Sequence, residues 1–170
     1  MSRLSCMILS ISVLSFAGAS FAEKKGFEMG AQDLAERGER EITELHQFFQ
    51  DWYRGSEAAD FQRFDQVLAE GFSIILPDGR ILERAVIVDA VRGQHDSDSQ
   101  AELEIRNVRL HKIHRNTAIF TYEEWQGRQG RSPRGRLSTV VFAGDQQAPN
   151  GLVWLHVHET WLPGQTGEND

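Results

Sequence analysis

Large apolar side chains recur at helical spacing in the first third of the chain. They are Ile42, Leu45, Phe48, Phe49, Trp52 and Tyr53. Positions spaced in this way lie along one face of an α-helix, so the pattern predicts a long amphipathic helix from Asp33. Gly55 is suited to end it, because glycine readily adopts the backbone conformation found after helix C-termini. We expect the apolar face of this helix to form much of the core.

Two shorter helices and a strand are predicted next. Asp60 is suited to cap a helix that ends by Gly71, and residues 72–76 then form an apolar strand. The strand runs into a turn at residues 77–79, where proline and glycine favour chain reversal. A third helix is predicted over about residues 83–92, although several of its residues are β-branched and favour strands.

The hydrophobic period changes after residue 100 from the helical spacing to simple alternation. Four segments alternate in this way: Glu102 to Ile113, Thr117 to Trp125, Arg136 to Ala143 and Leu152 to Trp161. Short polar or glycine-containing turns separate them, which is typical of antiparallel strands joined by hairpins. The chain is therefore expected to be an α+β protein, with three N-terminal helices packed on a strongly curved, mainly antiparallel sheet. Such a sheet leaves a conical space beside the long helix, which is a natural pocket.

The first 22 residues have the layout of a secretory signal. Arg3 precedes an apolar run from Leu4 to Phe16, and small residues follow up to Ala22. The run is short for a membrane-spanning helix. We expect cleavage after Ala22, with Ala19 as the alternative site, and hence a periplasmic or secreted protein with no membrane contact. A retained membrane anchor is the competing interpretation.

Composition favours one domain that is stabilised by its core. The single cysteine, Cys6, lies inside the predicted signal, so a mature chain would have no disulfide. We expect a linker over residues 23–35, a single domain over residues 36–163 and a polar tail over residues 164–170. The formal charge of −7 argues against nucleic acid as a partner. The basic stretch at residues 128–136 could hold a small anion, or be only a solvated hairpin loop.

Four histidines on the predicted strands are candidate metal ligands. His156 and His158 lie two residues apart on the last predicted strand, so regular alternation puts both on one face, roughly 7 Å apart. His111 and His114 are three apart and would face opposite sides of their strand, so at most one could join the pair. A zinc site needs three or four convergent ligands. We therefore expect no metal and no cofactor.

A small-molecule pocket on the sheet is the preferred interpretation of the polar strand residues. Alternation gives Trp154 the same face as His156 and His158, while Arg136 and Glu124 lie on faces of the preceding strands that could coincide with it. Arg136 could hold an anion, and either histidine could act as an acid or base, which makes both catalytic candidates. The expected ligand-binding residues are Arg136, His156, His158, Trp154, Tyr122 and Glu124. The alternative is that the histidines only form structural hydrogen bonds.

Three motifs in this order resemble those of a known superfamily. They are "PDGR" at residues 77–80, "RLSTVVF" at residues 136–142 and "LHVHET" at residues 155–160. The chain from Glu39 to Pro163 resembles the nuclear transport factor 2-like superfamily, and its SnoaL-like and calcium/calmodulin-dependent kinase II association-domain branches look nearest. The resemblance implies a cone-shaped domain with a cavity, dimeric through its sheet.

The resemblance leaves the activity open, because members include isomerases, cyclases, dehydratases and scaffolding modules. A ketosteroid-type isomerase is disfavoured, since Leu76 stands where that branch has its aspartate base. Asp78 and Tyr53 fit a turn and a core aromatic better than a catalytic pair. We expect an exported homodimer that binds a small polar or anionic organic molecule in the cone. The alternatives are a non-catalytic association module, or a SnoaL-like cyclase, isomerase or dehydratase.

Overall fold

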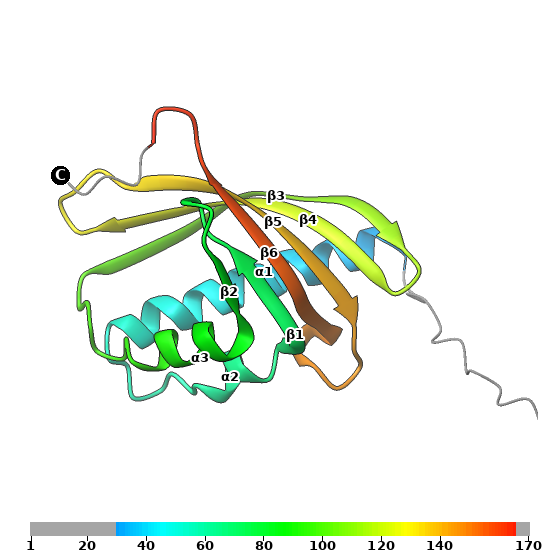
Figure 1. The fold of residues 1–170 in the computed structure, drawn as a ribbon, viewed down its shortest axis with the longest axis horizontal. Coiled ribbons are helices and arrows are strands. Elements are labelled where there is room, and N and C mark those ends of the chain that lie inside the picture. The colour runs from blue at the N-terminus through cyan, green and yellow to red at the C-terminus, as the bar shows by residue number, and fades with distance from the viewer. Residues whose placement is uncertain (1–29, 166–170) are drawn as a thin grey trace, which may run out of the picture.

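A long helix is wrapped by one strongly curved sheet in the computed structural model, which describes residues 30–165 (Figure 1). The elements in chain order are α1 (Ala31–Tyr53), α2 (Gln62–Asp65), β1 (Leu68–Ile75), β2 (Ile81–Glu83), α3 (Arg84–Arg92), β3 (Ala101–His114), β4 (Thr117–Arg128), β5 (Arg134–Gly144), the 3-10 turn η1 (Pro149–Gly151) and β6 (Leu152–Trp161). The predicted signal peptide at residues 1–22 lies outside the described residues. None of the helices within residues 30–165 is long and apolar enough to span a membrane.

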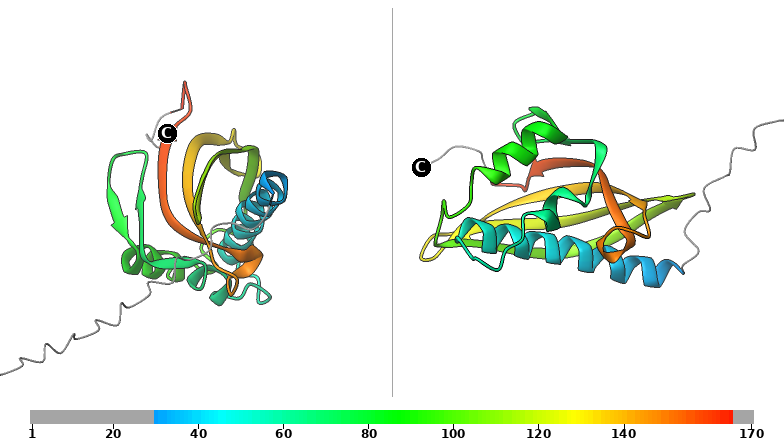
Figure 2. Two further views of the ribbon diagram at one scale, coloured as in Figure 1. Left: turned by 90° about the vertical axis from the view of Figure 1, so that its right-hand side faces the viewer. Right: turned by 90° about the horizontal axis from the view of Figure 1, so that it is seen from below.

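The six strands form one sheet in the order β2-β1-β6-β5-β4-β3. Neighbouring strands are antiparallel except β1 and β6, which pair in parallel. Figure 2 shows the sheet curling, with α1 lying along its inner side and α3 near one end. The predicted α+β class, with helices on a curved, mainly antiparallel sheet, is confirmed.

The core lies between α1 and the concave face of the sheet. Alternate residues of β4 and β5 point inward and are fully buried, as in Phe120 and Phe142, whose rings meet edge to face at 5.5 Å. Gly38 on α1 allows the close approach of Phe120, because a Cβ atom there would lie 2.2 Å from the ring. The close packing of α1 against β4 therefore requires glycine at this position, although glycine is a poor helix former.

A buried carboxylate fastens α1 to three other parts of the chain. Glu41 has no exposed surface. It accepts two hydrogen bonds from Arg63 at 2.8 and 3.2 Å, one from Trp154 Nε1 at 2.9 Å and one from Asn150 at 3.0 Å. Burial raises the pKa of Glu41, and the positive charge of Arg63 opposes the rise. This fully bonded group has a structural role.

The N-terminal elements differ in extent from the sequence prediction. Helix α1 begins at Ala31 and fully buries Leu34, so the folded domain starts before the expected boundary at residue 36. Helix α2 covers only Gln62–Asp65, because Leu68 already belongs to β1 and pairs with Trp154. The short strand β2 was not predicted, whereas α3 confirms the third helix.

Strand β6 contains a β-bulge, an extra residue that interrupts its alternation. His156 pairs with Val141 of β5, and Trp154 pairs with Phe142, which leaves Leu155 without a partner on that strand. A bulge of this kind reverses the inward and outward positions that follow it. Trp154 therefore faces the core, and so do Val157 and Glu159, which are 4% and 3% exposed.

Candidate functional site

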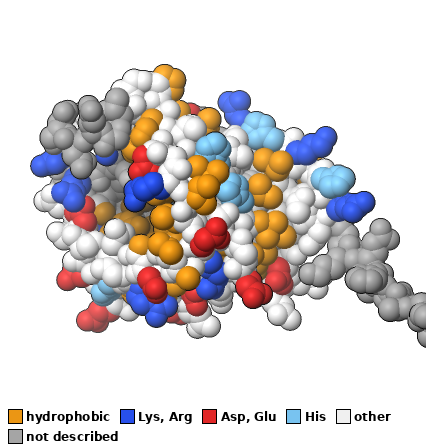
Figure 3. Space-filling view, viewed as in Figure 1, with side chains coloured by type: hydrophobic (Ala, Val, Ile, Leu, Met, Phe, Trp, Pro, Cys, Tyr) orange, Lys and Arg blue, Asp and Glu red, His pale blue; other side chains and the backbone are white. Residues whose placement is uncertain are grey.

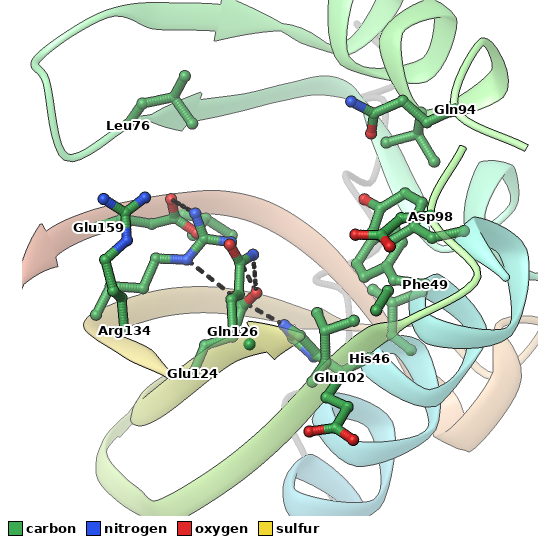
Figure 4. Close-up of a pocket in the computed structure, with 18 of the residues that line it drawn as sticks. His46, Phe49, Leu76, Gln94, Asp98, Glu102, Glu124, Gln126, Arg134 and Glu159 are labelled. Atoms are coloured by element: carbon green, nitrogen blue, oxygen red, sulfur yellow. Dashed lines mark hydrogen bonds and ion pairs between the residues drawn. The ribbon is translucent and has the colours of Figure 1, made fainter. Parts of the chain in front are cut away.

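A cavity of about 1250 Å³ lies between α1 and the concave face of the sheet. One wall is apolar and comes from β1 and α3, with Leu76 at its edge. The opposite wall carries polar side chains of β4, β5 and β6, and Figure 4 shows Glu124, Gln126 and Glu159 grouped on it. The cavity is therefore polar on one side and apolar on the other, as sites for organic molecules commonly are.

Glu124 and Arg136 form the centre of the polar wall. They are direct partners in the pairing of β4 with β5, and both side chains point inward. Arg136 donates two hydrogen bonds to the carboxylate of Glu124, at 2.7 and 3.1 Å. Burial alone would raise the pKa of Glu124, but Arg136 and His46 outweigh it and hold this pKa well below its usual range. The carboxylate is therefore ionised at neutral pH.

His46 approaches the same carboxylate from α1. Its Nε2 lies 3.2 Å from Glu124, and its Nδ1 lies 2.7 Å from the carbonyl oxygen of Ile42. The carbonyl can only accept, so Nδ1 is the donor of that bond. Gln126 donates a further hydrogen bond to Glu124 at 2.7 Å. Arg136 and Gln126 together donate three hydrogen bonds to Glu124, so the carboxylate is firmly held and acts to orient Arg136.

Glu159 is different, because its burial is not matched by hydrogen bonds. One carboxylate oxygen, Oε2, lies 3.1 Å from Arg136 Nη1 as an ion pair, yet it accepts no aligned hydrogen bond from any described residue. Burial raises the pKa of Glu159 to about 7 against the attraction of Arg136, and the charge of Glu124 adds to the rise. Glu159 thus presents an acceptor with unused capacity beside the cavity, and it changes charge near neutral pH.

Aromatic side chains complete the cavity beside this polar group. Tyr53, Tyr122 and Trp154 all line it. Tyr122 and Trp154 are 2% exposed, and their rings meet edge to face at 6.5 Å. Burial, followed by the charge of Glu124, raises the pKa of Tyr53 to about 12, so its hydroxyl stays protonated at neutral pH.

The structure places four of the six predicted ligand-binding residues at the cavity and two outside it. Those at the cavity are Arg136, Trp154, Tyr122 and Glu124. The prediction that His156 and His158 share a face with Trp154 is wrong, because the bulge at Leu155 turns both to the outer face of the sheet. His156 Nδ1 is hydrogen-bonded to the hydroxyl of Ser73 at 2.9 Å, and His158 is exposed. Neither imidazole can reach a ligand in the cone.

The other strand histidines also lie outside the cavity. A bulge in β3 leaves His111 without a pairing partner on β4, so His111 and His114 do not take opposite faces as alternation predicted. His111 is hydrogen-bonded to the side chain of Thr121 at 2.7 Å, and both histidines are exposed. Figure 3 shows histidine side chains, in pale blue, on the side of the sheet turned away from α1. Within residues 30–165, no three histidine, cysteine or acidic side chains are placed to hold a metal ion.

His46, Gln126 and Glu159 line the cavity but were not predicted from the sequence as site residues. His46 follows Ile42 by four positions, so it lies on the apolar face of α1, and a polar residue inside such a stripe is the signal that could have revealed it. Glu159 gave no usable signal, because regular alternation put it on the face opposite Trp154.

Solved structures show that this fold is that of the nuclear transport factor 2-like superfamily. An NTF2-like protein of unknown function from Pseudomonas aeruginosa is 28% identical, with a TM-score of 0.67 over 74% of this chain and 98% of that one. The association domain of CaMKII from C. elegans is 18% identical, with a TM-score of 0.54 over 75% of this chain and 98% of that one. At 18% identity, the similarity to the CaMKII domain supports only the fold.

A match to a protein-family model places the chain in a narrower family. The chain belongs to the family described as sucrose-6-phosphate phosphohydrolase C-terminal, whose model matches residues 38–163. Sucrose-phosphatase 2 from Nicotiana tabacum is 21% identical over 134 residues, which are 73% of this chain. The match spans only 30% of the length of that relative.

Proposed function

We propose that the cone cavity binds a small, uncharged organic molecule that is rich in hydroxyl groups. The observation that carries the proposal is the buried Glu159, whose Oε2 accepts no hydrogen bond from any residue between 30 and 165 although Arg136 lies beside it. Leaving a buried acceptor unbonded costs about 1–3 kcal/mol. A ligand hydroxyl that donates to Glu159 would remove this cost.

The charge balance of the polar wall favours a neutral ligand there. Arg136 is the arginine expected to hold an anion, but it is already paired with Glu124 and faces Glu159. A carboxylate ligand at this point would lie close to two protein carboxylates and would be repelled. A hydroxyl group suits the site better, because it can accept from the guanidinium and donate to Glu159 at once.

The rest of the cavity suits the carbon skeleton of such a molecule. The aromatic rings and the apolar wall offer surface to C–H groups, while the polar wall offers hydrogen bonds. Carbohydrates combine both kinds of surface. The names of the matched family and of its tobacco relative support this choice, since both refer to enzymes of a phosphorylated sugar.

Titration with neutral sugars, sucrose first, tests the proposal. We expect sucrose or a related sugar to quench or shift tryptophan fluorescence, because Trp154 lines the cavity. Glu159→Leu should weaken binding about tenfold or more, as the loss of a hydrogen bond to a charged group would. The matched control is Glu57→Gln at an exposed loop position. Absence of binding across a panel of neutral sugars, or equal affinity in all three proteins, would refute the proposal.

A second candidate function is self-association through the outer face of the sheet, as a homodimer. Ile119 on β4 and Leu137 on β5 are 36% and 39% exposed at adjacent central strands. The likeness to association domains suggests that such folds form oligomers. Leu137→Glu should shift the protein to monomers in light scattering after size-exclusion chromatography. Ile81 lies on the edge strand β2 and is 63% exposed, so Ile81→Glu should leave the mass unchanged.

Export is proposed from the first 22 residues, which lie outside the described part of the chain. Sequencing of the N-terminus of protein recovered from a periplasmic or culture fraction should find Glu23 first. Protein that starts at Met1 and stays with the membranes would instead support a retained anchor.

A further inference from the structure

One row of cross-strand partners brings three oxygen-bearing side chains together on the inner face of the sheet. Tyr122 on β4 pairs with Ser138 on β5, and Ser138 pairs in turn with Glu159 on β6. Ser138 has no exposed surface, and the other two are 2% and 3% exposed. This row follows the Glu124–Arg136 pair on the side away from the β4–β5 hairpin. The polar wall of the cavity therefore continues into the buried part of the sheet.

Two neighbouring residues of this row have buried atoms without hydrogen bonds. Among the buried side-chain polar atoms of residues 30–165, those without a hydrogen-bond partner are Ser138 Oγ and Glu159 Oε2. The two residues are direct partners in the pairing of β5 with β6. The Cβ atoms of such partners lie about 4.5–5.5 Å apart, so one small group can contact both side chains. The arrangement indicates a single shared partner.

The phenol of Tyr122 lies on the other side of Ser138 in the same row. Burial, followed by the charges of Glu124 and Glu159, raises the pKa of Tyr122 well above its usual range, and the Ser138 hydroxyl opposes the rise. The phenol is therefore protonated at neutral pH. The row thus offers two hydroxyl groups and a carboxylate oxygen, which can donate and accept. Internal water molecules are held by about three such polar groups.

We propose that Ser138 and Glu159 form a site for one hydroxyl-sized group, which water occupies in the free protein and one hydroxyl of the ligand occupies in the complex. This inference rests on the proposed function, because the ligand must carry hydroxyl groups. The bound group donates its hydrogen to Glu159 Oε2 and accepts a hydrogen bond from Ser138 Oγ. Ser138 is thereby a specificity-determining residue of the cavity.

The site selects a free hydroxyl over other oxygen groups. Glu159 borders the cavity, so a ligand can reach it (Figure 4). Displacing an ordered water lowers affinity unless the incoming group reproduces the hydrogen bonds of that water. A hydroxyl does so, whereas an ether oxygen can only accept and leaves an ionised Glu159 unbonded. The cavity should therefore reject a ligand whose hydroxyl at this point is methylated.

A crystal structure of the ligand-free protein tests the site without any sugar. It should show one water within about 3.2 Å of both Ser138 Oγ and Glu159 Oε2. A Ser138 hydroxyl bonded directly to Glu159, with no water between them, would overturn the inference.

Sucrose and its derivatives with one methoxy group in place of one hydroxyl test the ligand side at pH 8, where Glu159 is mostly ionised. Ser138→Ala should weaken sucrose binding about fivefold, as the loss of one hydrogen bond would. The matched control is Thr139→Val, which removes a hydroxyl from the next residue of β5, on the outer face opposite His158. This control should bind sucrose as wild type does.

The methoxy derivatives identify the hydroxyl that enters the site. Methylation at one position should weaken binding to wild type about tenfold or more, because a hydrogen bond to a charged group is lost. In Glu159→Gln the same methylation should cost less than about threefold, since the amide of glutamine can donate to the ether oxygen.

The possible results separate this inference from the proposed function. Unchanged sucrose affinity in Ser138→Ala would overturn the inference and leave sugar binding standing. Equal affinity of wild type for sucrose and all its methoxy derivatives would do the same. A water at the site in a protein that binds no neutral sugar would instead support the site and refute the proposed function.

Discussion

Replacing Glu159 by glutamine should remove part of the pH dependence of the free energy of unfolding. The pKa of Glu159 is raised by burial from its ordinary 4.5 to about 7. Between these values the folded protein binds a proton that the unfolded chain has released. The stabilisation from this proton is complete below pH 4.5 and is lost as the pH rises through about 7. One pKa unit corresponds to about 1.4 kcal/mol, so the total loss is about 3 kcal/mol.

Glutamine resembles the protonated carboxyl in shape and cannot ionise. Glu159→Gln should therefore be close to wild type in free energy of unfolding at pH 4.5 and about 3 kcal/mol more stable relative to it at pH 8. The lowered pKa of Glu124 has the opposite effect, because its stabilisation is lost as the pH falls below 4.5. That effect is common to both proteins and cancels in their difference.

Urea unfolding followed by tryptophan fluorescence, at half-unit steps from pH 4.5 to 8, measures this difference. Glu57→Gln at an exposed position controls for the loss of a carboxylate, and its difference from wild type should stay within about 0.5 kcal/mol throughout. Parallel curves for Glu159→Gln and wild type would show that the buried carboxyl does not titrate in this range. That result would refute the reasoning on the polar wall.

Three further predictions concern packing and the outer face. Gly38→Ala should lower the free energy of unfolding by about 1–2 kcal/mol in urea titrations, because the added Cβ would meet the ring of Phe120. This loss is expected although alanine is a better helix former than glycine, and a gain in stability would contradict it. Arg63→Leu should cost about 3 kcal/mol because it leaves the buried Glu41 without its cation, and a loss under 1 kcal/mol would show that the remaining bonds suffice. His158→Ala should change the affinity for any cavity ligand less than twofold in fluorescence titration, because the side chain is on the outer face.

The sequence predicted the fold well because most strands alternate regularly. The boundaries expected for the last strand, Leu152 to Trp161, match β6, and the pairing of Glu124 with Arg136 follows from ordinary hairpin register. Alternation failed where a strand contains a bulge, at His111 in β3 and at Leu155 in β6. Leucine is common in strands, and the residues around Leu155 in the sequence do not indicate that it will be unpaired. A bulge arises from the fit between adjacent strands, which a local pattern does not contain.

Buried polar residues were the other difficulty. Hydrophobic patterning treats Glu41 and Glu159 as surface residues, because an isolated carboxylate is costly to bury. Both become tolerable only when an arginine from a distant segment faces them, Arg63 in one case and Arg136 in the other. Such a pairing depends on tertiary contacts and cannot be predicted from local sequence patterns.

The bulge at Leu155 has a consequence for comparing proteins by their motifs. Removing one residue at that point would restore regular alternation and exchange the two faces of the strand beyond it. The cone would then receive imidazoles in place of the carboxylate of Glu159. Two homologues could therefore share the letters "HVHET" and still offer different chemical groups to a ligand. In such proteins the motif shows which side chains face the cavity only after its strand has been aligned, residue by residue, with the neighbouring strand.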